Sequence, residues 1–146
     1  MSILDSKTTV TPGSGDYRWL RSNFGRGAQL SATVDVNLLV AGTHYDAKTG
    51  IVPAGLPLGK ITATGNYGPY DPTATDGRDV LEGFLSAPEQ LEWEAFTGIT
   101  STELYVSYLW VAAVDPAYVP TAPTLNNTIK TTGLFKYVGV DYVVSA

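Results

Sequence analysis

The stretch from Gln29 to Leu38, QLSATVDVNL, alternates between apolar and polar residues without a break. Successive side chains of a β-strand point to opposite faces, so Leu30, Ala32 and Val34 would share one face and their polar neighbours the other. An α-helix would instead spread these residues around its circumference. The pattern therefore predicts a half-buried strand over residues 29–38 and a fold that is built on β-sheet.

The remaining sequence agrees with one mainly β domain. The chain has 146 residues, 44% of them apolar and 16% charged, which is typical of one folded domain. Its nine tyrosines and three tryptophans favour strands. We expect a compact single β domain with one or two short helices.

The secondary-structure pattern can be assigned segment by segment. Residues 60–64 and 79–85 are predicted strands, and the proline-containing residues 65–77 a loop. The nearly continuous apolar run 104–114 fits a strand buried on both faces, although a buried helix has the same pattern. Two strand-like runs follow within 134–146. Between these regions, Thr124 and Gly133 could cap the ends of a short helix over residues 123–133.

Residues 1–28 differ in composition from the rest of the chain, because they combine Gly, Ser, Thr and Pro with a small aromatic and basic cluster. Turn-forming residues with few apolar ones indicate an extended N-terminal arm. The β-rich domain then spans residues 29–146. We expect residues 1–20 to be flexible or loosely attached when no partner is bound.

The arm has one concentrated feature, the sequence DYRWLRS at residues 16–22. Tryptophan, tyrosine and arginine are enriched at the residues that dominate binding energy in protein interfaces. This composition favours an anchor on another chain, formed by Tyr17, Arg18, Trp19, Leu20 and Arg21. The alternative is that Trp19 and Leu20 pack on their own domain.

The sequence GLPLGKITATGNYGPYDP, from Gly55 to Pro72, superficially suggests a phosphate-binding loop. A P-loop needs G-x-x-x-x-G-K followed by Ser or Thr, whose hydroxyl binds magnesium. The spacing from Gly55 to Gly59 is one residue short, and Ile61 stands at the hydroxyl position. We therefore interpret these glycines and prolines as residues that form turns and end strands.

Few residues could support catalysis or bind a metal. Cysteine is absent, and His44 is the single histidine, two residues from Asp46 in a turn-like stretch. A hydrogen-bonded or surface histidine is far more common in such a place than a catalytic dyad without a nucleophile motif. The acidic stretch DPTATDGRD lacks the EF-hand pattern and its closing glutamate. We expect no catalytic residue, no metal and no cofactor.

Charge and hydropathy disfavour two classes of partner. The net charge is −5 and the isoelectric point about 4.6, which opposes binding to nucleic acid through its phosphates. The longest apolar stretch, residues 104–114, is about half of the ~20 residues that a membrane helix needs. The opening sequence MSILDSKTTV has no features of a signal peptide, so no export signal is expected.

The order of short turn motifs over residues 55–85 resembles the phage head decoration protein family, the trimeric capsid-stabilising proteins related to the lambda decoration protein. In that family a G-x-x-L-G-K turn precedes a G-x-Y-x-P-Y loop, and a D-G element leads into a strand with a G-[FVI]-L pattern. DYRWLRS is also similar to the arm motif of members from actinobacterial phages. The matching positions are Gly55, Leu58, Gly59, Lys60, Gly65, Tyr67, Pro69, Tyr70, Asp76, Gly77, Gly83, Phe84 and Leu85.

The resemblance covers residues 15–86 well and the remainder only in general pattern, since residues 104–120 are longer and more aromatic than in the small lambda-type members. It implies a β-tulip or barrel-like domain of the decoration-protein type. In that domain Gly59, Gly65, Tyr67, Pro69, Tyr70, Asp76 and Gly77 would form a structural loop.

The function implied by this resemblance is that of a structural virion protein rather than an enzyme. Such a protein binds the outer surface of the assembled capsid as a homotrimer and clamps neighbouring subunits of the major capsid protein. It would be found on the virion, and in the host cytoplasm during assembly. The aromatic residues in YGPY, WEAF and AYVP leave a carbohydrate-binding β module on a virion or cell surface as the alternative.

Overall fold

A computed structural model of the chain describes residues 16–22, 25–94 and 98–140. Within these ranges the protein is mainly β, which confirms the predicted fold class. The helical elements described are 3-10 turns of three residues each, η1 (Arg26–Ala28), η2 (Val36–Leu38) and η3 (Pro116–Tyr118). The strands are β2 (Leu30–Asp35), β3 (Ile51–Val52), β4 (Pro57–Lys60), β5 (Tyr67–Pro69), β6 (Leu81–Leu85), β7 (Glu89–Gln90), β8 (Trp93–Glu94), β9 (Gly98–Ile99), β10 (Glu103–Leu109), β11 (Val111–Val114) and β12 (Leu134–Tyr137).

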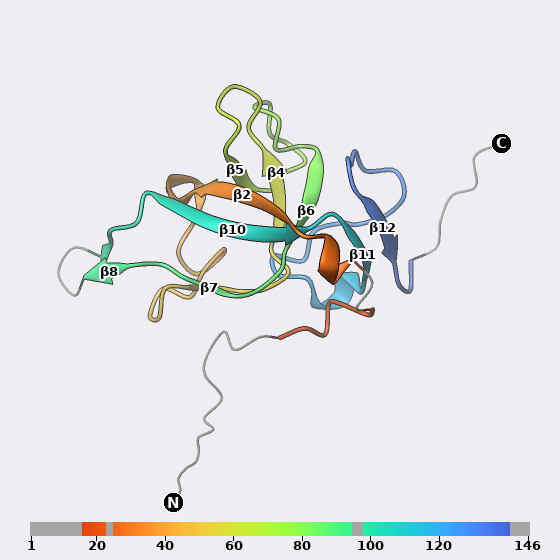
Figure 1. Ribbon diagram of the computed structural model, residues 1–146, viewed down its shortest axis with the longest axis horizontal. Coiled ribbons are helices and arrows are strands. Elements are labelled where there is room, and N and C mark those ends of the chain that lie inside the picture. Colours follow the sequence, from red (N-terminus) through yellow and green to blue (C-terminus); the bar gives the residue numbers. More distant parts are fainter. Residues whose placement is uncertain (1–15, 23–24, 95–97, 141–146) are drawn as a thin grey trace, which may run out of the picture.

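Five strands close into a barrel in the order β10, β2, β5, β4 and β6 (Figure 1). The longest pairing is antiparallel, between β10 and β2, and runs from Glu103 opposite Asp35 to Tyr108 opposite Leu30. The other pairs are antiparallel as well, except for the short parallel contact of β2 with β5. A closed barrel leaves none of its strands as an open edge.

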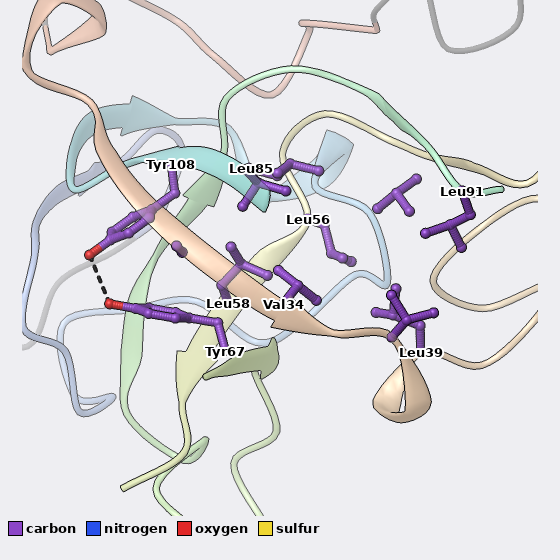
Figure 2. Close-up of a cluster of buried hydrophobic side chains, with 12 residues drawn as sticks. Val34, Leu39, Leu56, Leu58, Tyr67, Leu85, Leu91 and Tyr108 are labelled. Atoms are coloured by element: carbon purple, nitrogen blue, oxygen red, sulfur yellow. Dashed lines mark hydrogen bonds between the residues drawn. The ribbon is translucent and has the colours of Figure 1, made fainter. Parts of the chain in front are cut away.

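The first of two hydrophobic clusters, drawn in Figure 2, combines residues of the barrel strands with residues outside them, among them Leu39, Val52 and Leu91. Alternate residues of β2 and β10 point inward, as the sequence pattern predicts for β2: Ala32 and Val34 are buried, while Leu30 at the strand end is 48% exposed. Two tyrosines from β5 and β10, the strands on either side of β2, meet here. The Tyr67 and Tyr108 hydroxyls are 3.1 Å apart, and burial together with this hydrogen bond raises the pKa of Tyr67.

The second cluster lies between the barrel and the β11–β12 ribbon, the pair of parallel strands at the right of Figure 1. Phe84 from β6 and Val114 from β11 are fully buried in it. Its other buried members are Trp19, Ala54, Tyr70, Leu81, Leu109, Ala112, Val119, Leu125 and Tyr137.

Some predicted element positions are confirmed. Residues 79–85 contain β6, and the predicted strand 29–38 contains β2 but continues from Val36 as the 3-10 turn η2. The run 104–114 is two strands, β10 and β11, and not a helix. They are separated at Trp110, where the chain passes from the barrel to the ribbon.

Three predictions of secondary structure are wrong. Residues 61–64 form a turn because β4 already ends at Lys60, and the predicted loop 65–77 contains β5. Pro69 is tolerated there because β2 pairs with β5 only at Tyr67, so no ladder hydrogen bond is needed from the nitrogen of residue 69. No helix occupies 123–133, because the chain is extended where residues 130–132 hydrogen-bond to both backbone groups of Leu81.

Candidate functional site

The residue predicted to anchor the arm, Trp19, lies in the core of its own domain. Its side chain is fully buried and stacks on Phe84, with ring centroids 5.9 Å apart. The indole also lies against the backbone of Gly55, where a Cβ atom would come within 2.6 Å of the ring. Gly55 is therefore required by close packing against Trp19 as well as by its positive φ of 87°.

Residues 19–21 run alongside β11 as an additional short extended segment, called here the docked segment. The Asp115 amide donates to the Trp19 carbonyl at 2.7 Å, and the Arg21 amide donates to the Ala113 carbonyl at 2.9 Å. Leu20 forms an antiparallel bridge with Val114. The Arg21 guanidinium also lies 2.8 Å from the Asp115 carboxylate.

These contacts correct the predicted boundary between an arm of residues 1–28 and a domain of residues 29–146. Residues 16–22 and 25–28 belong to the domain, and the indole of Trp110 donates to the carbonyl of Ala28. A buried Trp19 has no exposed surface with which to bind another chain, so its assignment as the capsid anchor is wrong, and Leu20 is half-buried beside it. The alternative, packing on the parent domain, is confirmed. Residues 1–15 of the predicted arm lie outside the described residues.

The remaining arm residues stay at the surface but are engaged locally. Arg18 is exposed and makes two hydrogen bonds to the Asp16 carboxylate, at 2.9 and 2.7 Å, while its guanidinium lies 4.6 Å from the centre of the Tyr118 ring. The side-chain hydrogen bonds from Arg18 lower the pKa of Asp16 to about 2. Tyr17 is half-buried under the guanidinium of Arg26. The five residues therefore do not form one exposed patch.

The glycines of the family-type loop have backbone roles. A Cβ atom on Gly59 would come within 2.6 Å of the Arg78 backbone, so two chain segments approach there as closely as only glycine permits. Gly65 and Gly77 have φ values of 78° and 114°, which residues with a side chain rarely adopt.

The other residues of this loop are also structural. Tyr67, Pro69 and Tyr70 are buried, so the aromatic residues of YGPY form no exposed platform for a sugar. Asp76 accepts hydrogen bonds from the backbone amide and the guanidinium of Arg78, which lowers the pKa of Asp76. Tyr67 packs in the barrel cluster and Tyr70 in the second cluster, so the loop contributes side chains to both cores.

His44 has the environment of a structural residue. Its Nδ1 accepts a hydrogen bond from the Val40 amide at 2.8 Å, and burial lowers its pKa. The Asp46 carboxylate accepts the amides of Lys48 and Thr49 and so closes the turn that was predicted there. A hollow of about 290 Å³ lies beside these residues. In the described ranges there is no group of three His, Cys, Asp or Glu side chains that could hold a metal ion.

A largely apolar concavity lies on the outer face of the β11–β12 ribbon and measures about 650 Å³. Val111 and Ala113 from β11 and Leu134 from β12 point to this face, and Leu134 is 68% exposed. Trp110 lines one part of it. We call this concavity the outer groove; its lining residues are Ser22, Trp110, Val111, Ala112, Ala113, Leu134, Phe135 and Lys136.

The outer groove was not predicted from the sequence, although a signal was present. VAAV at 111–114 and LFKY at 134–137 are apolar on both faces of a strand, apart from Lys136. Such runs indicate strands buried on both sides. In the structure only one side is covered by the core: Ala112, Val114 and Tyr137 are buried, whereas Leu134 and Lys136 are exposed.

Comparison with known proteins gives no relative from which a function could be transferred. No family model matches the chain, and no curated protein matches it. Among the described residues, no helix is long and apolar enough to cross a membrane. The outer groove is therefore identified as the candidate site from its own geometry.

Proposed function

We propose that this protein is a structural component of a phage virion that binds the outer surface of the assembled capsid as a homotrimer. In this role it contacts neighbouring subunits of the major capsid protein and stabilises the shell without catalysis, cofactor or metal. It acts on the virion, after assembly in the host cytoplasm. The order of turn motifs over residues 55–85 suggests this role, and the outer groove supplies a surface suited to it.

The outer groove carries the proposal. Exposed apolar surface of this kind marks contacts with other proteins, because its burial is favourable and its exposure is not. Leu134 is the most exposed large aliphatic residue in the described chain, and it lines this groove together with Trp110, Val111 and Ala113. Ser22 and Lys136 are the polar residues among those that line the groove. A lining of mostly apolar residues is typical of the centre of a protein interface.

The barrel and the trimer would then have different roles in binding. The barrel holds the ribbon in a fixed position, and three ribbons in one trimer contact three sites on the shell. Once the first contact forms, the next ones become intramolecular, so modest single contacts give long residence on the capsid. The shell is held together because one trimer contacts several capsid subunits.

Cosedimentation with expanded empty shells of the same virus tests the proposal. We expect the wild-type chain to sediment with the shells, and Leu134→Asp to reduce occupancy about 30-fold, the effect of losing about 2 kcal/mol at an interface residue. Leu30→Asp is the matched control because Leu30 is also an exposed strand leucine, on the barrel. Both variants should keep the unfolding free energy within about 0.5 kcal/mol. Absence of the wild-type protein from the shell pellet would contradict the proposed function.

One observation favours a carbohydrate-binding module as the second candidate. A hollow of about 490 Å³ at the barrel is lined by Tyr105, which is 74% exposed, and by residues that include Ser31, Thr33 and Lys60. An exposed aromatic face beside hydroxyl groups suits a sugar ring. Binding on a glycan array that is lost in Tyr105→Ala and kept in Leu134→Asp would favour this candidate.

A further inference from the structure

The single histidine of the chain, His44, closes a loop formed by residues 40–45, called here the latch loop. The Val40 amide donates to Nδ1 of the His44 ring at 2.8 Å, and the Val40 carbonyl accepts a hydrogen bond from the His44 amide, also at 2.8 Å. Both backbone groups of Val40 are therefore held by one residue. Histidine is also the side chain that ordinarily changes its charge between pH 5 and 8.

The rest of the latch loop is held at the surface by backbone hydrogen bonds. The Gly42 amide donates to the Tyr45 carbonyl at 2.8 Å, and the Thr43 amide donates to the Val40 carbonyl at 3.1 Å. The tip of the loop is open, because nothing described lies within 4 Å of a Cβ atom built on Gly42. Since little packing supports the tip, the hydrogen bond to the His44 ring contributes directly to loop closure.

We propose that the latch loop is a pH-sensitive element, which is closed while the His44 ring is neutral and opens when the ring takes up a proton. Nδ1 accepts the Val40 amide through its lone pair, and in the imidazolium form this nitrogen carries a hydrogen instead. Two N–H groups would then face each other across the present hydrogen bond. Protonation therefore removes the acceptor and turns the ring away. The proposal goes beyond the proposed function and does not depend on it.

The groups around His44 act on its protonation in opposite directions. Burial of the ring and the positive charge of Arg78, which is itself paired with Asp76 at 3.0 Å, lower the pKa of His44. The Asp46 carboxylate lines the same hollow and would favour the imidazolium, although its Oδ1 already accepts two backbone amides. Tyr45 is the other titratable residue that lines this hollow. Burial and Arg78 prevail, so the closed loop favours the neutral ring.

The lowered pKa fixes the direction of the response. A histidine that is free in an open loop has a pKa of about 6.5, and the closed loop holds the pKa of His44 below this value. Between the two values the open loop binds more protons than the closed one. Closure is therefore complete above pH 6.5 and weakens as the pH falls below it, by up to about tenfold in the closing equilibrium per pH unit.

Opening of the latch loop would affect one end of the first hydrophobic cluster. Leu39, which directly precedes the loop, is buried in this cluster, and Tyr45 packs against it. Leu39 lies at the end of the cluster away from Tyr67 and Tyr108 (Figure 2). Neither residue 39 nor residue 45 belongs to a barrel strand, so acid would loosen this end of the domain while the barrel stays paired.

Amide hydrogen exchange, followed by NMR on the full chain at pH 7.5 and 5.5, tests the inference. The protection factor of the Val40 amide, corrected for the intrinsic exchange rate at each pH, should fall about three- to tenfold on acidification. His44→Asn is the matched control, because its side-chain oxygen can accept the same amide but does not titrate, and it should stay protected at both pH values. His44→Ala has no acceptor and should be poorly protected at both.

A pH-independent protection factor in the wild type, or the same loss in His44→Asn, would overturn the inference. An NMR titration of the wild type gives an independent measurement, since the signals of one histidine are unambiguous. At pH 7.5 the ring nitrogen shifts should show a hydrogen on Nε2 and none on Nδ1, and the ring should titrate below pH 6.5. The Val40 and Gly42 amide shifts should change with the same midpoint. A hydrogen on Nδ1 at pH 7.5, or amide midpoints unrelated to that of the ring, would contradict the proposal.

Discussion

The closed barrel and the β11–β12 ribbon contain similar apolar strands but differ in whether the edges of these strands are paired. In the barrel, each of the five strands has two neighbouring strands. One side of the sheet wall is core, and the other side exposes few large apolar residues apart from Leu30 and Tyr105. In the ribbon, β12 is the outermost described strand, and an exposed leucine lies next to the open edge. The barrel is therefore suited to hold a shape, and the ribbon to meet other chains.

Trp19 connects the two regions. Its ring stacks on Phe84 of the barrel strand β6, and its carbonyl accepts a hydrogen bond from Asp115 at the end of β11. A residue from outside both sheets thus fixes their relative position. The first prediction tests this role, because it separates a folding function of Trp19 from a binding function.

Trp19→Ala should lower the unfolding free energy by about 3–5 kcal/mol, the range for a large buried aromatic that is truncated in a core. Urea denaturation followed by circular dichroism measures the change. Tyr118→Ala is the control, since Tyr118 is a 45% exposed aromatic at the surface and should cost far less. A Trp19→Ala protein with wild-type stability and reduced shell binding would contradict the buried position and restore the predicted arm anchor.

Within the barrel, Gly59→Ala should lower the unfolding free energy by about 1–3 kcal/mol. The added Cβ would lie 2.6 Å from both the Cα atom and the carbonyl oxygen of Arg78, and backbone cannot move aside as a flexible side chain can. Gly27→Ala is the matched control, because nothing lies within 4 Å of its added Cβ and its φ is not positive. If the two variants had equal stability in the same urea titration, the close approach of β4 and Arg78 would be wrong.

The sequence predicts strand β2 and the structural glycines of the barrel, but it places the barrel strands β4 and β5 wrongly. The alternation at residues 29–35 identifies a half-buried strand because one barrel face is core and the other is solvent. Gly59, Gly65 and Gly77 could be recognised as structural because turns and close approaches require glycine regardless of the partner. Sequence rules for single turns and strands are sufficient where the local backbone geometry alone determines which residue is needed.

The position of Trp19 could not be predicted in this way. DYRWLRS has the composition of an interface anchor, but the same tryptophan fits a cavity formed by Phe84, Gly55 and Val114, which are distant in sequence. Composition indicates that a large aromatic side chain will be buried, but it does not indicate whether its own chain or another chain will cover it. The outer groove was missed for the same reason, since a strand that is apolar on both faces looks identical whether or not the second face is covered.

The smallest expected effect concerns how the docked segment is attached to the ribbon. Three kinds of contact hold it: the packing of Trp19, the backbone hydrogen bonds with Ala113 and Asp115, and the ion pair of Arg21 with Asp115. The Arg21 side chain is 50% exposed, so water and salt screen its charge, and partly exposed ion pairs contribute about 0–1 kcal/mol. The backbone hydrogen bonds do not depend on the side chain at position 21.

Arg21→Ala should therefore lower the unfolding free energy by no more than about 1 kcal/mol, and less in 1 M salt, in the same urea titration. Arg21 is the residue to change because Asp115 also accepts the Ala117 amide at the start of η3, so its replacement would disturb a second structure. Arg21→Lys keeps the charge and serves as the control. A loss as large as that of Trp19→Ala would mean that the ion pair, and not Trp19 packing with the backbone ladder, fixes residues 19–21 beside β11.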